Sequence, residues 1–267
     1  MTGSKVERKL LHYTGKAIAR FNLIEKNDRV LVCLSGGKDS FTLLKILSLL
    51  QRRAKINFEL QVLAVDQGLV GWQPQVLASW LEDHGYSFAI LETEISKVKA
   101  AKHRPKVSPC VLCSRLRRGY IYTYAKKHCY HKVALGHHRE DLITSLLMSI
   151  CYSGKISSMP PKLITQDQRL TVIRPLAFCQ ENDIATYASE QHFPVVVAGQ
   201  CPASEYNIRK EVGRLISELA IKNPKVPSNI LHALQQVQLS QLMDNRLYDF
   251  KNLAAISSSS AEEIEEL

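Results

Sequence analysis

The segment from residue 35 to residue 40 carries the residue types best suited to chemistry on phosphate. It reads Ser-Gly-Gly-Lys-Asp-Ser and stands between an apolar run, residues 30–34, and a helical pattern that begins at residue 41. Glycines allow a tight turn with exposed N–H groups, and a helix N-terminus favours negative charge at the same point. The sequence therefore predicts an anion cradle whose members are Ser35, Gly36, Gly37, Lys38, Asp39 and Ser40.

The carboxylate of Asp39 adds a second element to this cradle. Phosphate alone does not call for a neighbouring carboxylate, whereas a hard cation such as Mg²⁺ would bridge the two. The GxxxxGK[ST] spacing of the other common phosphate loop is absent, so we expect a different class of nucleotide site. A plain strand-to-helix turn with a polar cap is the alternative interpretation.

Cysteine spacing predicts a second chemical centre. Cys110 and Cys113 form a C-x-x-C directly before a basic helical pattern, and this spacing is typical of a thiol redox pair, half of a zinc site or part of an iron–sulfur site. Cys201, which follows the last expected strand, is the best candidate for a third thiol. Three cysteines with an open fourth position would suit an iron–sulfur cluster. We expect a structural role for the remaining four, Cys33, Cys129, Cys151 and Cys179.

The segment Gly136-His137-His138-Arg139-Glu140-Asp141 also joins an expected strand to an expected helix. Its carboxylates and imidazoles, Asp141 among them, could orient Mg²⁺, phosphates or an attacking base. A helix cap with incidental histidines is the alternative.

Apolar periodicity predicts an α/β fold in which strands and helices alternate. We expect strands at residues 29–34, 58–65, 87–91, 132–136, 171–174 and 194–197, and intervening helices at 40–54, 73–84, 111–128, 141–152 and 181–191. This order predicts a doubly wound parallel sheet, with helices on both faces and ligands at the carboxyl ends of the strands. An amphipathic helix at 5–26 precedes the sheet, and residues 203–253 read as helical without a strand. The expected divisions are an N-terminal helical part in 1–28, the α/β domain in 29–200, a helical segment in 201–253 and a disordered tail in 254–267.

Composition points to a polyanionic partner. The 267 residues include 35 Lys and Arg against 25 Asp and Glu, which gives a net charge of +10. An ATP site alone does not require this excess, whereas a nucleic acid would favour it. No apolar run is long enough for a membrane span and the N-terminus lacks the apolar core of a secretion signal, so we expect a cytoplasmic protein. In that reducing compartment, the seven cysteines favour metal or redox chemistry over disulfides.

Five motifs in one order carry a family resemblance. SGGKDS, CVLCSRLRRG, LGHHRED, SGK followed by MPPKL, and IRPL resemble the tRNA 2-thiocytidine synthetases of the pyrophosphate-loop (PP-loop) superfamily, over roughly residues 5 to 250. The resemblance implies an adenine nucleotide alpha hydrolase-like domain, a [4Fe-4S] cluster and a homodimer. One departure is Cys201-Pro202-Ala203-Ser204, which stands where the family often has a second C-x-x-C and is closer to related 2-thiouridine enzymes.

The resemblance also implies roles for individual residues. It implies that residues 35–40 bind ATP, with Gly136 and His137 near the nucleotide and Asp66 near the ribose or adenine. It also implies that Asp39 binds Mg²⁺ and that the thiols of Cys110, Cys113 and Cys201 are ligands of the cluster. The implied partners are tRNA and a sulfur donor such as a cysteine desulfurase.

The implied reaction is ATP-dependent thiolation at C2 of cytidine 32 in the tRNA anticodon loop. The base oxygen would attack the α-phosphorus of ATP, and sulfur would then displace AMP. Three alternatives remain open at this point: a 2-thiouridine synthetase, a persulfide relay between thiols without a cluster, and a basic RNA-binding module that is not an enzyme. The pyrophosphate cradle disfavours the last, because RNA affinity does not need one.

Overall fold

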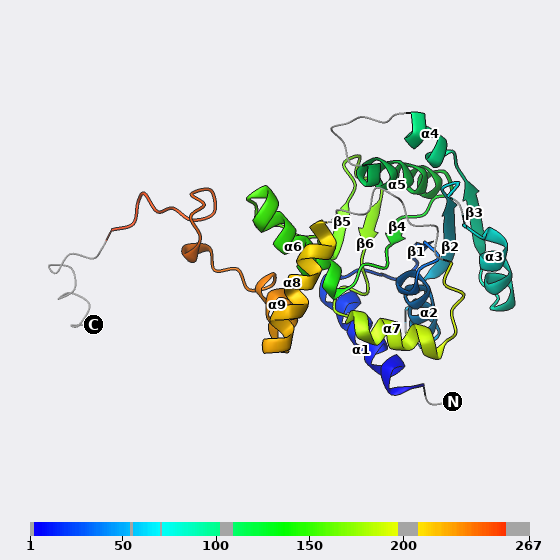
Figure 1. Ribbon diagram of the computed structural model, residues 1–267, viewed down its shortest axis with the longest axis horizontal. Helices are drawn as coiled ribbons and strands as arrows, with labels where there is room; N and C mark the ends of the chain where they lie inside the picture. The colour runs from blue at the N-terminus through cyan, green and yellow to red at the C-terminus, as the bar shows by residue number, and fades with distance from the viewer. Residues whose placement is uncertain (1–2, 54–55, 70, 102–108, 197–207, 255–267) are drawn as a thin grey trace. The chain divides into compact units, whose positions relative to one another are not determined.

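A computed structural model describes residues 3–53, 56–69, 71–101, 109–196 and 208–254; the side chains of 99–101 and 109–111 are not described. Tertiary contacts divide the chain into one unit at residues 1–227 and a second at 228–267. In the first unit, six strands form one sheet in the order β3-β2-β1-β4-β6-β5 (Figure 1). The strands are β1 (Arg29–Leu34), β2 (Glu59–Asp66), β3 (Phe88–Glu92), β4 (Lys132–Ala134), β5 (Lys162–Ile164) and β6 (Thr171–Ile173).

All strand pairs in this sheet are parallel except the pair of β5 and β6. The described helices are α1 (Lys5–Phe21), α2 (Lys38–Arg53), α3 (Pro74–Asp83), α4 (Ile95–Ala101), α5 (Pro109–Lys127), α6 (Arg139–Ser153), α7 (Glu181–Glu190), α8 (Ile208–Lys222) and α9 (Val226–Ala233). A short 3₁₀ turn, η2 (Leu239–Gln241), lies in the second unit, and α9 spans the boundary between the units.

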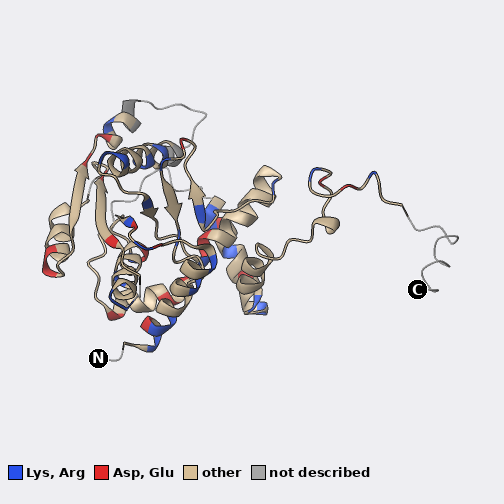
Figure 2. Ribbon diagram, turned by 180° about the vertical axis from the view of Figure 1, so that it is seen from behind, with Lys and Arg blue, Asp and Glu red and all other residues tan. Residues whose placement is uncertain are grey.

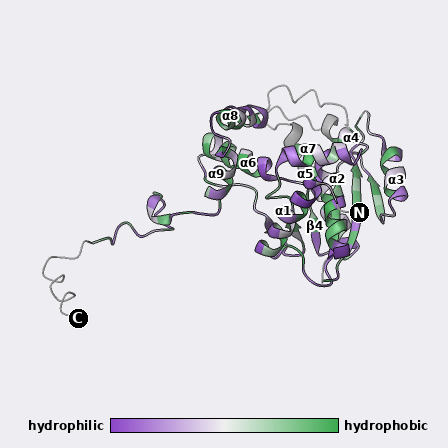
Figure 3. Ribbon diagram, turned by 90° about the horizontal axis from the view of Figure 1, so that it is seen from below, coloured by the Kyte–Doolittle hydropathy of each residue, from purple (hydrophilic) through white to green (hydrophobic). Residues whose placement is uncertain are grey.

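Alternate residues of β1 enter two different cores, one on each face of the sheet. Val30, Val32 and Leu34 belong to the larger cluster, which α1, α2, α3 and α7 complete. Leu31 belongs to the second cluster, with apolar residues of α4 and α5. Figure 3 shows hydrophobic residues along the strands that lie between these helices. Because successive side chains of a strand point to opposite faces, β1 is covered on both sides, and the predicted doubly wound sheet is confirmed.

Several predicted boundaries differ from the structure. The first helix ends at Phe21, not at residue 26, because Asn22 adopts the left-handed conformation (φ 46°) and its N–H closes the helix on the Ile18 carbonyl. The helix α4 and the antiparallel strand β5 were not predicted; both are short. Short elements give too few residues for a periodic pattern to show.

The prediction of a strand at 194–197 is wrong for residues 194–196, the part that the structure describes. Residues 194–196 pair with no strand of the described sheet, and the Val196 N–H instead donates to the Gly36 carbonyl at 3.0 Å. In the described part of the predicted helical segment, residues 208–253, helices occupy 208–222 and 226–233, and beyond residue 233 only the short 3₁₀ turn η2 is present. The predicted domain divisions stay a prediction, and most of the predicted tail lies outside the described residues. None of the described helices is both long and apolar enough to cross a membrane.

Candidate active site

The turn between β1 and α2 requires glycine at residue 36. Gly36 has φ +82°, and a Cβ there would lie 2.9 Å from the Trp72 ring and 3.0 Å from the Val196 carbonyl oxygen. A side chain at this position would therefore meet both a strained backbone and a steric clash. The strand-to-helix context that the sequence indicated is present, with α2 starting at Lys38.

Two serine hydroxyls hold the shape of this loop. The Ser35 N–H donates to Ser40 Oγ at 3.1 Å, and Ser40 Oγ donates to the Gly37 carbonyl at 2.8 Å. The two hydroxyl oxygens lie 3.2 Å apart. These bonds order the loop without a ligand, so its remaining N–H groups are positioned in advance for an anion.

Lys38 points to carboxylates beside the loop. Its Nζ lies 3.1 Å from Asp39 Oδ1 and 3.0 Å from Glu181 Oε1 of α7. Burial alone would lower the pKa of Lys38, but the two carboxylates outweigh burial and raise it. Lys38 therefore stays a cation that partly neutralises Asp39.

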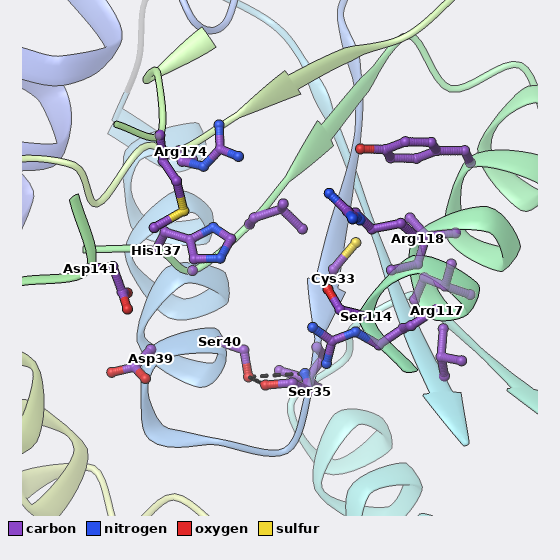
Figure 4. Close-up of a pocket in the computed structure, with 18 of the residues that line it drawn as sticks. Cys33, Ser35, Asp39, Ser40, Ser114, Arg117, Arg118, His137, Asp141 and Arg174 are labelled. Atoms are coloured by element: carbon purple, nitrogen blue, oxygen red, sulfur yellow. Dashed lines mark hydrogen bonds between the residues drawn. The ribbon is translucent and has the colours of Figure 1, made fainter. Parts of the chain in front are cut away.

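A cavity of about 490 Å³ opens at the carboxyl ends of the strands, above this loop (Figure 4). Predicted site residues that line it are Ser35, Asp39, Ser40, Gly136, His137 and Asp141. Gly36, Gly37 and Lys38 are not among the lining residues, and Gln67 lines it in place of its neighbour Asp66. The Asp66 carboxylate instead accepts the Gly68 N–H at 2.7 Å. The ligand roles of all these residues stay predictions.

His137 is a neutral group at the wall of the cavity. Burial, followed by the positive charge of Arg174, lowers the pKa of His137 to about 4. Its Nδ1 is buried and has no hydrogen-bond partner among the described residues. At neutral pH the ring can donate or accept a hydrogen bond without adding charge to the site.

Asp39 and Asp141 lie against the same buried imidazole. Nε2 of His138 is 3.8 Å from Asp39 Oδ1 and 3.5 Å from Asp141 Oδ2. Burial lowers the pKa of His138, but its hydrogen bond to Glu140 and the carboxylates around it produce a net rise. Burial alone would raise the pKa of Glu140, but its interactions with His138 and Arg139 outweigh burial and lower the pKa to about 2. Arg209 of α8 completes the group through an ion pair with Asp141 Oδ1 at 3.0 Å.

The two carboxylates fit Mg²⁺ only when other ligands complete its shell. The described residues include no group of three or more His, Cys, Asp or Glu side chains arranged to hold a metal ion. Mg²⁺ usually binds proteins through one or two carboxylates, together with water and substrate phosphates. Asp39 and Asp141, both at the cavity surface, provide a donor set of this kind.

The predicted cluster thiols are only partly within the described structure. Cys110 and Cys113 occupy the first turn of α5, three residues apart, and the Cys113 side chain is half-buried. The Cys110 side chain and all of Cys201 lie outside the described residues. Ser114, the residue after Cys113, lines the cavity, so the described thiol lies next to a residue of the cavity wall. Convergence of the three thiols stays a prediction.

Four of the cavity-lining residues that the sequence interpretation missed are polar or ionisable and bear on the chemistry of the site. No functional role was assigned to Arg174 or Arg209. Gln67 is the neighbour of the predicted site residue Asp66, and Cys33 was assigned a structural role. Burial raises the pKa of the Cys33 thiol to about 12. For Arg174 a signal existed, since a charged residue directly after a buried strand lies at the ligand-binding edge of such a sheet.

The fold and the loop define the class of this protein. The family model described as PP-loop domain matches residues 3–199, so the chain is a PP-loop protein. It is 52% identical to a tRNA-cytidine(32) 2-sulfurtransferase of Legionella pneumophila (strain Paris), over 94% of this chain and 88% of the relative. Identity to the protein of the same name from Coxiella burnetii (strain CbuG_Q212) is 47%, over 95% of this chain and 99% of the relative. The chain belongs to the tRNA-cytidine(32) 2-sulfurtransferase family.

One solved structure supports the fold independently. The U34-tRNA thiolase NcsA from Methanococcus maripaludis, determined with its [4Fe-4S] cluster, superposes with a TM-score of 0.69 at 19% identity. The match covers 88% of this chain and 80% of that chain. At this identity the likeness concerns the arrangement of the sheet and helices. The resemblance inferred from the five sequence motifs is confirmed by the relatives named above.

Proposed function

We propose that this protein uses ATP to activate C2 of cytidine 32 in tRNA and replaces the C2 oxygen with sulfur. The observation that carries the proposal is the joint presence of a preorganised anion loop and two carboxylates in one cavity, in a chain of this family. ATP binds with its β- and γ-phosphates on the Ser35–Ser40 loop. Asp39 and Asp141 would hold Mg²⁺, which would neutralise charge on the phosphates.

The first chemical step forms an adenylate. The cytidine O2 attacks the α-phosphorus, a new P–O bond forms, and the bond to the β-phosphate oxygen breaks. Pyrophosphate leaves onto the loop N–H groups, where the helix dipole of α2 stabilises its charge. The protein contributes mainly by holding the two substrates in line.

The second step exchanges oxygen for sulfur. A sulfur nucleophile attacks C2, and the C2–O bond breaks with AMP as the leaving group. A [4Fe-4S] cluster on Cys110, Cys113 and Cys201 would supply an iron site for the incoming sulfur. Neutral His137, at the cavity wall, would hydrogen-bond a substrate without repelling Arg174.

The RNA would approach over a basic surface. Figure 2 shows several Lys and Arg positions along α5, the helix that carries Arg117 and Arg118 at the cavity. We include in the proposal further phosphate contacts at Arg115, Lys126 and Lys127, a homodimer, a cysteine desulfurase as sulfur donor and a cytoplasmic location.

Two measurements test this function. Nucleosides of tRNA from cells that lack the protein should contain no 2-thiocytidine when analysed by mass spectrometry; loss of 2-thiouridine instead would assign the other base. The protein purified without oxygen should be brown, contain iron and sulfide, and convert ATP to AMP only when tRNA is present. A colourless preparation that thiolates tRNA would favour a persulfide relay.

A further inference from the structure

Arg174 is a buried cation that forms no ion pair with a carboxylate of the described residues. Arg174 is only 7% exposed, and no carboxylate oxygen of the described residues lies within 4.0 Å of a nitrogen of its guanidinium. One nitrogen, Nη1, donates to the Pro160 carbonyl, and Nε has no partner in the described structure. Burial of an unpaired charge costs free energy, so a buried arginine that faces a cavity is a candidate to bind an anion.

Two side chains of α5, Arg118 and Tyr122, line the same cavity as Arg174. Burial raises the pKa of Tyr122, and the positive charges of Arg118 and Arg174 reduce that rise. Burial lowers the pKa of Arg174 and the charge of Arg118 lowers it further, whereas Tyr122 and Asp141 act in the opposite direction without restoring it. Two cations that repel each other beside one hydroxyl form a site that an anion would stabilise.

This group is separate from the loop that receives pyrophosphate. Arg174 directly follows β6, and β6 lies two strands from β1, on the side opposite β2. Adjacent strands are about 4.8 Å apart, so the two strand ends are separated by about 10 Å. In the view of Figure 4, Arg174 lies beyond His137 from the Ser35–Ser40 end of the cavity.

We propose that Arg118, Tyr122 and Arg174 form a second phosphate site, which holds a backbone phosphate of the RNA next to the reacting nucleotide. Arginine suits this role because its planar fork of N–H groups matches two phosphate oxygens. A nucleotide that enters the cavity brings its phosphodiester with it, and this negative charge needs a partner there. The assignment to RNA rests on the proposed function, whereas the existence of an anion site does not.

The test uses binding equilibria of the full-length protein. The variants are Arg118→Gln, Tyr122→Phe and Arg174→Gln, and the matched control is Arg169→Gln, which removes an exposed arginine just before β6. The probe is an anticodon stem-loop RNA with a cytidine at the target position, titrated at several salt concentrations. Each arginine variant should bind at least about tenfold more weakly at low salt. Loss of one phosphate contact should also reduce the salt slope by about 0.7–0.9.

A second titration identifies the source of the phosphate. ATP and AMP affinities, measured by calorimetry, should be unchanged in all four variants. Weaker ATP or AMP binding with unchanged RNA binding would overturn the RNA assignment and give the site to a nucleotide phosphate. Unchanged affinity for both probes would overturn the site itself.

Folding and activity do not confound these outcomes. Arg118 is exposed, so Arg118→Gln tests the site even where Arg174→Gln destabilises the protein. Thermal unfolding of each variant reports on stability. Because both titrations measure binding and not turnover, a failure to detect cytidine thiolation would contradict the proposed function without deciding the fate of the phosphate site.

Discussion

Gly136 passes so close to the phosphate loop that a Cβ on it would lie 3.1 Å from the main-chain carbon and oxygen of Asp39. The same Cβ would lie 3.2 Å from the Ser40 nitrogen. All these atoms are backbone, so no side chain can rotate away to make room. The end of β4 therefore sets the position of the first turn of α2.

Replacement of Gly136 should displace the phosphate loop. Gly136→Ala should weaken ATP binding, measured by calorimetry, and lower the free energy of unfolding by about 1–3 kcal/mol through overpacking. Gly213→Ala is the matched control, because a Cβ at Gly213 in α8 meets nothing within 4 Å. That change should stabilise the protein by about 0.5–1 kcal/mol. Equal effects of the two substitutions would contradict the close approach.

Asp39 should be required for adenylation. Asp39→Asn removes the charge that holds Mg²⁺ in our proposal, and we expect tRNA-dependent conversion of ATP to AMP to fall by about 10²-fold or more. A radiolabelled ATP assay measures this rate. Asp83→Asn, an exposed residue at the end of α3, should leave the rate unchanged. Normal turnover by Asp39→Asn would remove Asp39 from the mechanism.

His137 should make stability depend on pH between about 6.5 and 4. Its folded-state pKa is about 4, below the ordinary value of 6.5, because it is buried and close to Arg174. The unfolded chain binds a proton at His137 more readily than the folded protein does. The contribution of His137 to the free energy of unfolding is therefore fully present above pH 6.5 and is lost as the pH drops toward 4. Urea unfolding at several pH values should show a smaller loss in His137→Gln. An identical loss in both proteins would show that His137 is not the group that titrates.

Cys113 and Cys33 should behave differently when replaced by serine. Cys113→Ser should lose bound iron and thiolation activity if its thiolate is a cluster ligand. Cys33→Ser should keep its iron, because a thiol with a pKa of about 12 is protonated at neutral pH and is a poor ligand and nucleophile. Iron and sulfide analysis after anaerobic purification measures the difference. Exposed Cys151 on α6 offers a control substitution, and loss of iron in Cys33→Ser would reverse the assignment.

Much of this architecture could be predicted from local pattern. The run from Val30 to Leu34 is apolar without alternation, as expected of a strand buried on both faces, and the glycines after it favour a tight turn. The same logic failed at residues 194–196, where apolar residues run beside the phosphate loop and pair with Gly36, not with a strand. Local periodicity does not distinguish these two environments.

The sequence by itself determined the loop, the alternation of strands and helices and the family, because each depends on residues that are neighbours along the chain. The position of Arg174 after a strand indicates the ligand-binding edge, but only the tertiary structure decided that Arg174, Cys33 and Arg209 share one cavity with Asp39. The physical reason is strand order: β4 lies next to β1 in the sheet and β6 next to β4, although β2 and β3 come between β1 and β4 in the sequence, so side chains far apart in the chain meet at one edge of the sheet. No short-range pattern encodes which strand becomes the neighbour of which.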